Sequence, residues 1–163
     1  RIVGLKYFNL YGPNEYHKEN MQSMVRKGFT QAQEKNKIQL FKSYRKEYKD
    51  GEQERDFLYV KDAVSMTLFF MANPNIGGIF NIGSGQARSW NDLAKYIFKA
   101  MNREPQIQYI SMPEKIIQQY QYHTCADIQK IFDTGYIKPI KSLEEGITDY
   151  VRNYLVGNKR LGS

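Results

Sequence analysis

The sequence predicts an α/β fold, in which helices alternate with the strands of a sheet. Short apolar runs rich in β-branched and aromatic residues occur at 2–8, 55–60 and 78–82. Segments with apolar residues at helical spacing lie between and after these runs. Two of the helical segments open with a capping box, which marks the start of a helix. Strands and helices that alternate along a chain are typical of layered α/β folds.

The first strand is predicted over residues 2–8, and a turn signal at 11–14 closes it. Because this apolar run begins at the first residue, we expect the other strands of its sheet to lie on upstream sequence. A helix is predicted over 21–33, with Met21, Met24, Val25 and Phe29 at helical spacing. A short strand over 38–41 and a polar, charged loop over 43–54 follow, and we expect this loop to be mobile and exposed.

The second half of the chain continues the alternation. A strand over 55–60 precedes a helix over 62–72, which Asn73 and Pro74 end. A strand over 78–82 follows, and later a strand over 107–110 and a short helix over 126–132.

Capping boxes define two more helices. Ser89 with Asp92 opens the first, whose predicted inward face carries Leu93, Ala94, Ile97, Phe98 and Met101. Ser142 with Glu145 opens the second, whose predicted inward face carries Leu143, Ile147, Tyr150, Val151, Tyr154 and Leu155. We expect a polar, frayed tail over 158–163.

Composition limits the class of protein. The chain has 163 residues, 41% of them hydrophobic and 25% charged, which is typical of one ordinary globular domain. No apolar run is long enough to span a membrane, and the first residues do not resemble a signal peptide. The single cysteine, Cys125, excludes an internal disulfide and suits a reducing cytoplasm, where we expect the protein to act. We expect its thiol to be buried and inert.

The net charge of +7 permits more than one class of partner. Attraction of a phosphorylated ligand, nucleic-acid binding and a merely solvated lysine-rich surface are all compatible with it. Basic residues are densest at 42–49, where acidic residues are interspersed, and no nucleic-acid-binding motif appears. We therefore expect no nucleic-acid or membrane partner. The histidines, His17 and His123, are far apart, so no metal site is predicted either.

The sequence Gly83-Ser84-Gly85 after a strand invites comparison with dinucleotide-binding turns. The third glycine of that fingerprint is missing, since Arg88 stands in its place, and no acidic residue follows about 20 positions on. The pattern therefore favours a structural turn over a phosphate-binding loop.

A stronger candidate site follows the first strand. The Gly12-Pro13 bend holds Asn9 at the carboxyl end of a strand, which is where α/β proteins bind ligands. The amide of Asn9 can donate and accept hydrogen bonds, which suits sugar hydroxyls or phosphate oxygens. Alternatively, Asn9 satisfies the backbone of its own loop.

Three motifs in a fixed order resemble one superfamily over almost the whole chain. They are YFNLYGP at 7–13, RDFLYVKD at 55–62 and FNIGSG at 80–85. This order is similar to that of the extended short-chain dehydrogenase/reductases that act on nucleotide sugars. The resemblance implies that residues 1–157 are a C-terminal, substrate-binding portion with the last elements of a Rossmann-like parallel sheet. The cofactor fingerprint and a catalytic tyrosine in a Tyr-x-x-x-Lys motif would lie upstream.

Further residues resemble the branch that epimerises ADP-heptose at carbon 6, which supplies heptose for lipopolysaccharide. These residues are His17, Lys18, Met21, Ser23, Pro113, Tyr120, Gln121 and the segments 135–139 and 145–148. The resemblance implies tightly bound NADP, removal of a hydride from carbon 6 and its return to the opposite face. It also implies a homo-oligomer. The chain alone would then be inactive.

The resemblance assigns roles residue by residue. Lys18 would be a catalytic acid/base group next to the cofactor, and the backbone of Leu10 would touch the cofactor. A lysine that serves as a base must be tuned by burial or by a neighbouring positive charge. Asn9 would contact the substrate, and Arg55 would engage its diphosphate with a planar fork. An ion pair of Arg55 with Asp56 or Asp62 and a surface location for Lys18 are the structural alternatives.

The remaining predicted contacts concern the nucleotide. Tyr120 would reach the diphosphate or the sugar, and Phe41 would stack on adenine; core packing explains both residues as well. Asn20 and Lys27 replace a serine and a histidine of the branch, although both can still bind polar groups. The charged loop after Phe41 is longer than in the branch.

Two rivals remain open. One is an epimerase or dehydratase acting on UDP-, GDP- or dTDP-sugars, which shares the first two motifs but does not need Lys18. The other is a non-catalytic module that binds a nucleotide sugar.

Overall fold

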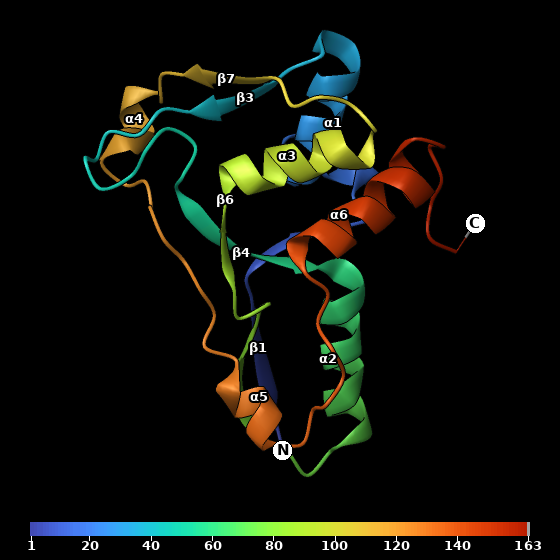
Figure 1. Ribbon diagram of the computed structural model, residues 1–163. Helices are drawn as coiled ribbons and strands as arrows, with labels where there is room; N and C mark the ends of the chain where they lie inside the picture. Colours follow the sequence, from blue (N-terminus) through green and yellow to red (C-terminus); the bar gives the residue numbers. More distant parts are fainter. Residues whose placement is uncertain (163) are drawn as a thin grey trace.

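Strand β4 (Glu54–Tyr59) connects an upper and a lower lobe in the computed structural model, which describes residues 1–162 (Figure 1). The lower lobe contains β1 (Val3–Tyr7), β5 (Gly78–Ile82), α2 (Val60–Ala72) and α5 (Gln129–Asp133). The upper lobe contains α1 (Met24–Lys35), β3 (Ile38–Phe41), α3 (Trp90–Ala100), β7 (Ile107–Ile110) and α6 (Leu143–Tyr150). The predicted α/β class is confirmed.

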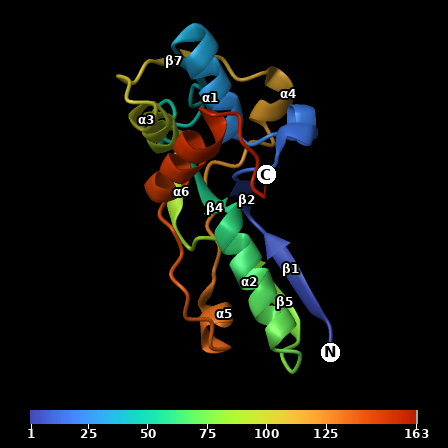
Figure 2. The ribbon, with the colours of Figure 1, turned by 90° about the vertical axis from the view of Figure 1, so that its right-hand side faces the viewer.

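Within residues 1–162 the strands form three small sheets, mostly parallel. β1 pairs with β5, and β3 pairs with β7, both in parallel. The third sheet has the order β2-β4-β6, where β2 (Asn9–Tyr11) is parallel to β4 and β6 (Ala87–Ser89) is antiparallel to it. In the lower lobe, α2 lies alongside β1 and β5 (Figure 2).

The strand predicted over residues 2–8 corresponds to β1, which ends at Tyr7. The Phe8 amide still donates to the carbonyl of Ile82, at the end of β5. The next residue, Asn9, pairs with Phe57 of β4. The chain therefore passes from the lower sheet to the upper one at Phe8, which places Asn9 at the junction of the lobes.

Strand β4 contributes side chains to both hydrophobic cores. Because side chains alternate along a strand, Phe57 and Tyr59 face the upper core while Leu58 faces the lower one. The upper core includes the fully buried Leu93, Ala94, Ile97, Phe98, Ile147, Tyr150 and Val151. The lower core includes Met66, Phe70, Phe80, Ile82, Ile131 and Tyr136. The inward faces predicted for the two capped helices thus form much of the upper core.

Helix boundaries follow local capping. Both predicted capping boxes are present, at the first turns of α3 and α6. The helix predicted over 21–33 starts later, because Ser23 accepts a hydrogen bond from the Arg26 amide as its N-cap. The preceding residues form a 3₁₀ helix, η1 (Tyr16–Met21), instead. The helix predicted over 126–132 is shorter, and α6 continues into a π-helical turn, η2 (Val151–Leu155).

Some elements have no counterpart in the predictions. They are β2, η1, β6 and the short helix α4 (Glu114–Ile117). β6 forms because its residues pair with the start of β4, a partner more than 30 residues away whose position no local pattern indicates.

The charged loop after β3 is more ordered than predicted at its far end. The Gln53 side chain is fully buried and donates to the carbonyls of Phe41 and Lys42. The Asp50 carboxylate accepts from the Ser43 amide, and the Asn91 side chain donates to the Asp50 carbonyl. The middle of the loop, residues 44–47, is exposed as expected.

The C-terminal residues return to the start of η1. The Asn14 side chain both accepts from the Leu161 amide and donates to its carbonyl. The Tyr16 hydroxyl donates to the carbonyl of Lys159. Residues 158–162 of the predicted frayed tail are therefore held by side chains at 14–16. Ser163, its last residue, lies outside the described residues.

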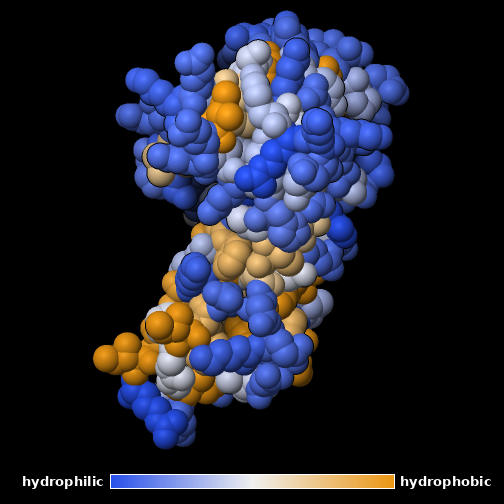
Figure 3. Space-filling view, turned by 90° about the vertical axis from the view of Figure 1, so that its left-hand side faces the viewer, coloured by the Kyte–Doolittle hydropathy of each residue, from blue (hydrophilic) through white to orange (hydrophobic). Residues whose placement is uncertain are grey.

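Polar and apolar surface differ between the lobes. Hydrophilic side chains dominate the upper lobe, whereas apolar side chains gather over the lower one (Figure 3). Ile2, Ile79 and Ile137 of the lower lobe are each more than 70% exposed. Among residues 1–162, no helix is both long and apolar enough to cross a bilayer. Contrary to expectation, Cys125 is exposed, because its segment runs along the protein surface.

Candidate functional site

Two adjoining cavities in the upper lobe collect most of the predicted binding residues. The first, of about 300 Å³, is lined by Met24, Gln31, Gln39, Leu40, Phe41, Arg55, Trp90, Ile110 and Tyr120. The second, of about 290 Å³, is lined by Asn9, Leu10, Tyr11, Met21, Gln22, Ser23, Met24, Val25, Phe57, Trp90 and Leu93. Met24 and Trp90 line both cavities, so the two form neighbouring parts of one candidate site.

Arg55 is a largely buried cation, and it has no acidic partner within residues 1–162. Its side chain is 8% exposed, and one guanidinium nitrogen donates to the Glu54 carbonyl at 2.7 Å. The guanidinium carbon lies 5.1 Å from the centroid of the Tyr120 ring and 5.9 Å from that of Trp90. Burial lowers the pKa of Arg55 from its ordinary value. A cation held in this way favours an anionic ligand.

The alternative role of Arg55, an ion pair with Asp56 or Asp62, is not observed within residues 1–162. The Asp56 carboxylate instead accepts from the amides of Ser84, Gly85 and Ala126. The Asp62 carboxylate accepts from the Lys141 amide. Both acids therefore stabilise turns of the lower lobe.

Trp90 is a site residue that the sequence analysis missed. Its indole nitrogen donates a 3.0 Å hydrogen bond to the Tyr120 hydroxyl, and its ring packs edge-on against Phe57. Burial raises the pKa of Tyr120, although Arg55 and the indole hydrogen bond oppose this effect. Trp90 directly follows the predicted N-cap Ser89, but no local pattern indicates its contact with Tyr120, 30 residues away.

One wall of the first cavity is apolar. Phe41 at the end of β3 lies edge-on to Tyr120, with ring centroids 6.3 Å apart. Leu40 and Ile110 extend this wall from the paired strands β3 and β7. Phe41 and Tyr120 are both half-buried, so neither is an ordinary core residue. A planar ring can be received here.

Asn9 and Leu10 line the second cavity. Both belong to β2, where Asn9 pairs with Phe57 and Leu10 pairs with Leu58 of β4. The Asn9 side chain is exposed, and within the described residues it makes no hydrogen bond, so it does not serve its own loop. Its amide is available to a ligand.

Lys18 and Asn20 lie in η1, and Lys27 lies near the start of α1. The Lys18 side chain is exposed and lines neither cavity. The amine of Lys27 donates to the Asn20 carbonyl at 2.6 Å. The structure therefore does not bring these three residues together with Arg55 and Tyr120, although Met21 to Ser23 connect their segment to the second cavity.

A buried acid, Glu15, holds both ends of the segment that carries Lys18. Its carboxylate accepts from the Ser23 amide at 2.5 Å, from the Ser23 hydroxyl at 2.7 Å and from the Tyr150 hydroxyl at 2.9 Å. Within the segment, Glu19 has a φ of 43°, in the left-handed region that is unfavourable for a residue with a side chain. The conformation of residues 15–23 is thus imposed by their anchors.

The turn at 83–85 is structural, as the sequence favoured. The Ser84 hydroxyl joins the amides of Ser84 and Gly85 in donating to Asp56. Since the carboxylate already occupies these donors, they are not free to bind a phosphate.

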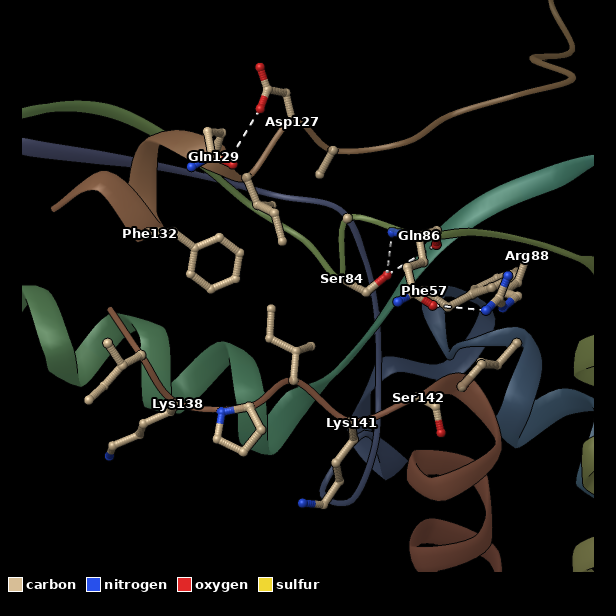
Figure 4. Close-up of a pocket in the computed structure, with 17 residues that line it drawn as sticks. Phe57, Ser84, Gln86, Arg88, Asp127, Gln129, Phe132, Lys138, Lys141 and Ser142 are labelled. Carbon is tan, nitrogen blue, oxygen red and sulfur yellow. Dashed lines mark hydrogen bonds between the residues drawn. The ribbon is translucent and has the colours of Figure 1, made fainter. Parts of the chain in front are cut away.

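A larger cavity of about 630 Å³ lies between this turn and the segment before α6. Lys138 and Lys141 line it, but their amines point away from Ser84 and Asp127 (Figure 4). The Arg88 side chain donates to Gln86 in the same lining. Its cations do not converge on a common point, so this cavity lacks the features of an anion site. Within residues 1–162 no cluster of potential metal ligands occurs.

Sequence comparison identifies the family. The profile described as "NAD dependent epimerase/dehydratase family" matches residues 1–83, which include β1, β2, Arg55 and β5 and end at Gly83. The chain belongs to the NAD dependent epimerase/dehydratase family.

Two curated members of this family are close relatives over nearly the whole chain. A protein of Nitratidesulfovibrio vulgaris (strain DP4) is 47% identical over 154 residues, which are 94% of this chain and 48% of that protein. A protein of Fusobacterium nucleatum subsp. nucleatum is 48% identical over 158 residues, 93% of this chain and 48% of that protein. Both are named ADP-L-glycero-D-manno-heptose-6-epimerase. The chain thus spans about half the length of the curated relatives it matches.

Two solved structures have a similar fold. The ADP-L-glycero-D-manno-heptose-6-epimerase of Helicobacter pylori has a TM-score of 0.76 and 34% identity, and the match covers 93% of this chain and 43% of that one. A UDP-N-acetylglucosamine 4-epimerase from Methanobrevibacter ruminantium M1 has a TM-score of 0.78 at 20% identity, covering 96% of this chain and 46% of that one. The second likeness concerns the fold alone.

Proposed function

We propose that this chain is the substrate-binding part of an enzyme that interconverts the two carbon-6 epimers of ADP-glycero-manno-heptose. The observation that carries this proposal is the identity of 47% and 48% to two proteins with that name. The cavities beside Arg55 supply the chemistry that such a substrate needs. The product would enter lipopolysaccharide, and the enzyme would act in the cytoplasm.

The nucleotide would occupy the first cavity. Adenine would lie against Phe41 and the apolar wall, and the diphosphate would face Arg55 and the Tyr120 hydroxyl. Arg55 supports this placement because it is buried, has no acidic partner within residues 1–162 and can engage two oxygens with its planar fork. The heptose would then extend towards Asn9 in the second cavity.

The NADP cofactor would be held mainly by residues outside this chain. When bound, it would supply the reversible hydride transfer that an epimerisation at carbon 6 requires. The glycine turn at 83–85 does not fit its phosphates, because Asp56 occupies the amides. Within this chain, the Leu10 backbone at the second cavity and Lys18 are the groups that would contact it.

Lys18 would exchange a proton with the sugar hydroxyl, opposite a tyrosine from the upstream part. Glu15 supports this role, since it fixes the segment that carries Lys18 next to the second cavity. Asn20 and Lys27 would contact the substrate from the same segment. The exposure of Lys18 is compatible with this role only if the upstream part covers η1.

The surface of the lower lobe supports such an upstream part. Val64, Leu68 and Met71 form an exposed apolar stripe along α2, with 50%, 53% and 73% of each residue exposed. On the described chain, β1 pairs only with β5, so its other edge is unpaired. We propose that upstream strands and a helix cover both features, with residues 1–157 as the C-terminal portion. The full-length enzyme would self-associate, which light scattering would measure.

The test uses the full-length protein with ADP-heptose. Lys18→Met should lower kcat by about 100-fold or more, which is the usual effect of removing an acid/base group. Lys35→Met removes an exposed lysine at the end of α1 and should leave kcat unchanged. Full activity of Lys18→Met would contradict the assignment and would favour an enzyme acting on UDP-, GDP- or dTDP-sugars.

A non-catalytic binding module is the other candidate. It would bind ADP-sugars without converting them even in the full-length protein, whereas the proposed enzyme must show turnover. The chain by itself should show neither turnover nor measurable NADP affinity. Epimerase activity in a preparation whose mass shows only this chain would contradict that expectation.

A further inference from the structure

The only tryptophan of the sequence, Trp90, lies where the two cavities meet. It contacts Arg55 and Tyr120, the two residues that bind the diphosphate in the proposed function. We propose that Trp90 is a positioning residue that makes Tyr120 a hydrogen-bond donor to the diphosphate. This inference rests on the proposed function, because it concerns the same ligand.

The direction of the hydrogen bond between Trp90 and Tyr120 is fixed by chemistry. An indole N–H can only donate, so the Tyr120 oxygen must accept. The phenol has one proton of its own, and within residues 1–162 no acceptor receives it. That proton therefore remains available on the side of the cavity. Burial raises the pKa of Tyr120, so the phenol keeps this proton at neutral pH.

Arg55 presents further unused donors at the same place. A guanidinium has five N–H groups, and here Nη1 alone has a protein acceptor, the Glu54 carbonyl, among the described residues. The remaining donors are not sealed from solvent, since none is both buried and unpaired. The Trp90 and Tyr120 rings lie against the guanidinium and limit its orientation. Tyr120 and Arg55 thus both offer hydrogen-bond donors to one anionic group.

Trp90 is itself held in place before any ligand binds. It is the first residue of α3, whose start is fixed by the capping box of Ser89 and Asp92. Its ring contacts Phe57 of β4 edge-on, with centroids 5.0 Å apart. A donor array that is ordered in advance costs less entropy on binding. The indole nitrogen, which is engaged with Tyr120, does not need to touch the ligand.

The experiment is a double-mutant cycle in the full-length protein, with ADP and adenosine as probes in calorimetric titrations. Trp90→Phe keeps an aromatic ring beside Arg55 but removes the N–H, and Tyr120→Phe removes the hydroxyl. Each single change should weaken ADP binding about three- to tenfold, as expected for one hydrogen bond, and leave adenosine binding unchanged. The double variant should bind ADP no more weakly than Tyr120→Phe, because the indole acts through the phenol.

Equal losses of affinity for ADP and adenosine, or additive losses of ADP affinity in the double variant, would overturn the inference. Trp90 would then only line the cavity. A wild-type protein that prefers UDP to ADP would refute the proposed function alone, and the same cycle with UDP and uridine would still test Trp90. A wild-type protein that binds no nucleoside diphosphate would refute both. If Trp90→Phe does not fold, Tyr120→Phe alone must weaken ADP and spare adenosine.

Discussion

The hydroxyl of Tyr150 in α6 donates a 2.9 Å hydrogen bond to the carboxylate of Glu15, which lies 135 residues earlier. The same carboxylate accepts two hydrogen bonds from Ser23, so it joins the last long helix to both ends of the Lys18 segment. Glu15 is 4% exposed and Tyr150 is fully buried. We expect Tyr150→Phe to lower the free energy of unfolding by about 1–2 kcal/mol, because a buried carboxylate loses one donor.

Urea unfolding measures this loss. Tyr44→Phe is the matched control, since the Tyr44 hydroxyl makes no hydrogen bond to any residue in 1–162, and its stability should stay within about 0.5 kcal/mol of the wild type. In the full-length enzyme, Tyr150→Phe should also lower kcat if Lys18 is catalytic, because its segment loses an anchor. Equal stability of the two variants would show that Glu15 does not depend on Tyr150.

We expect Asp56 to be the acidic residue whose substitution lowers the free energy of unfolding most. It is fully buried, and its two oxygens accept from the Ser84 amide and hydroxyl and from the amides of Gly85 and Ala126. Asp56→Asn places an NH₂ group against two of these donors, so we expect unfolding free energy to fall by about 3 kcal/mol or more.

The control for Asp56 is Asp127→Asn in the neighbouring segment. Asp127 is exposed, and among the described residues its carboxylate accepts only from the Gln129 amide, which an asparagine oxygen can still do. Its unfolding free energy should change by less than about 0.5 kcal/mol. Hydrogen exchange adds a local measurement, since the Ala126 amide should lose protection in Asp56→Asn. A stable Asp56→Asn with a protected Ala126 would contradict the role of this carboxylate.

The elements with local signals were predictable. The strands at 38–41, 78–82 and 107–110 have the predicted bounds, because apolar runs between turn residues specify them without distant contacts. The capping boxes at Ser89 and Ser142 were recognisable because both partners lie within four residues. The Gly-Pro bend predicted Asn9 at the carboxyl end of the first strand, whereas the structure makes Asn9 the first residue of β2.

Contacts between distant residues were not predictable. Nothing near Glu15 indicates its pairing with Tyr150, and nothing near Asn14 indicates that it holds Leu161. For the same reason Trp90 was missed, since its role depends on Tyr120, 30 residues away. Arg55 and Tyr120 were named from a family resemblance, and their proximity comes from the pairing of β3 with β7 and β4 with β6.

Gly146 is required where α6 crosses β2 and β4. A Cβ atom built on it would overlap the Tyr11 hydroxyl and lie 3.2 Å from the Tyr59 Cβ. We expect Gly146→Ala to lower the free energy of unfolding by about 1–2 kcal/mol, because overpacking outweighs the gain in helix propensity. Gly4→Ala is the control, since the nearest atom to its Cβ would be Ile79 Cγ1 at 3.4 Å. Adding Tyr11→Phe should recover part of the loss, and no recovery would contradict the proposed clash.

The stability contribution of Asp149 should disappear in acid. Partial burial alone would raise its pKa, but hydrogen bonds from Lys61, Tyr59 and Asn153 together hold the pKa of Asp149 below its ordinary value. A carboxylate whose pKa is lowered by folding stabilises the protein above its unfolded-state pKa of about 3.9, and this contribution is lost as pH falls through the folded-state pKa. Asp149→Asn should therefore be less stable than the wild type by roughly 1 kcal/mol at pH 7, and the difference should shrink below about pH 4.

Urea unfolding at pH 7, 5, 4 and 3 would follow this difference, with Lys61→Met as the matched variant. Lys61 donates to Asp149 at 2.8 Å, so its removal should reproduce part of the loss at neutral pH and little of it in acid. Added salt of about 1 M should reduce the ion-pair portion of the effect but leave the Tyr59 hydrogen bond. Acid protonates the Asp149 carboxylate and so removes its charge. A difference in unfolding free energy between wild type and Asp149→Asn that stays constant from pH 7 to 3 would therefore mean that the loss reflects shape and packing and not the charge.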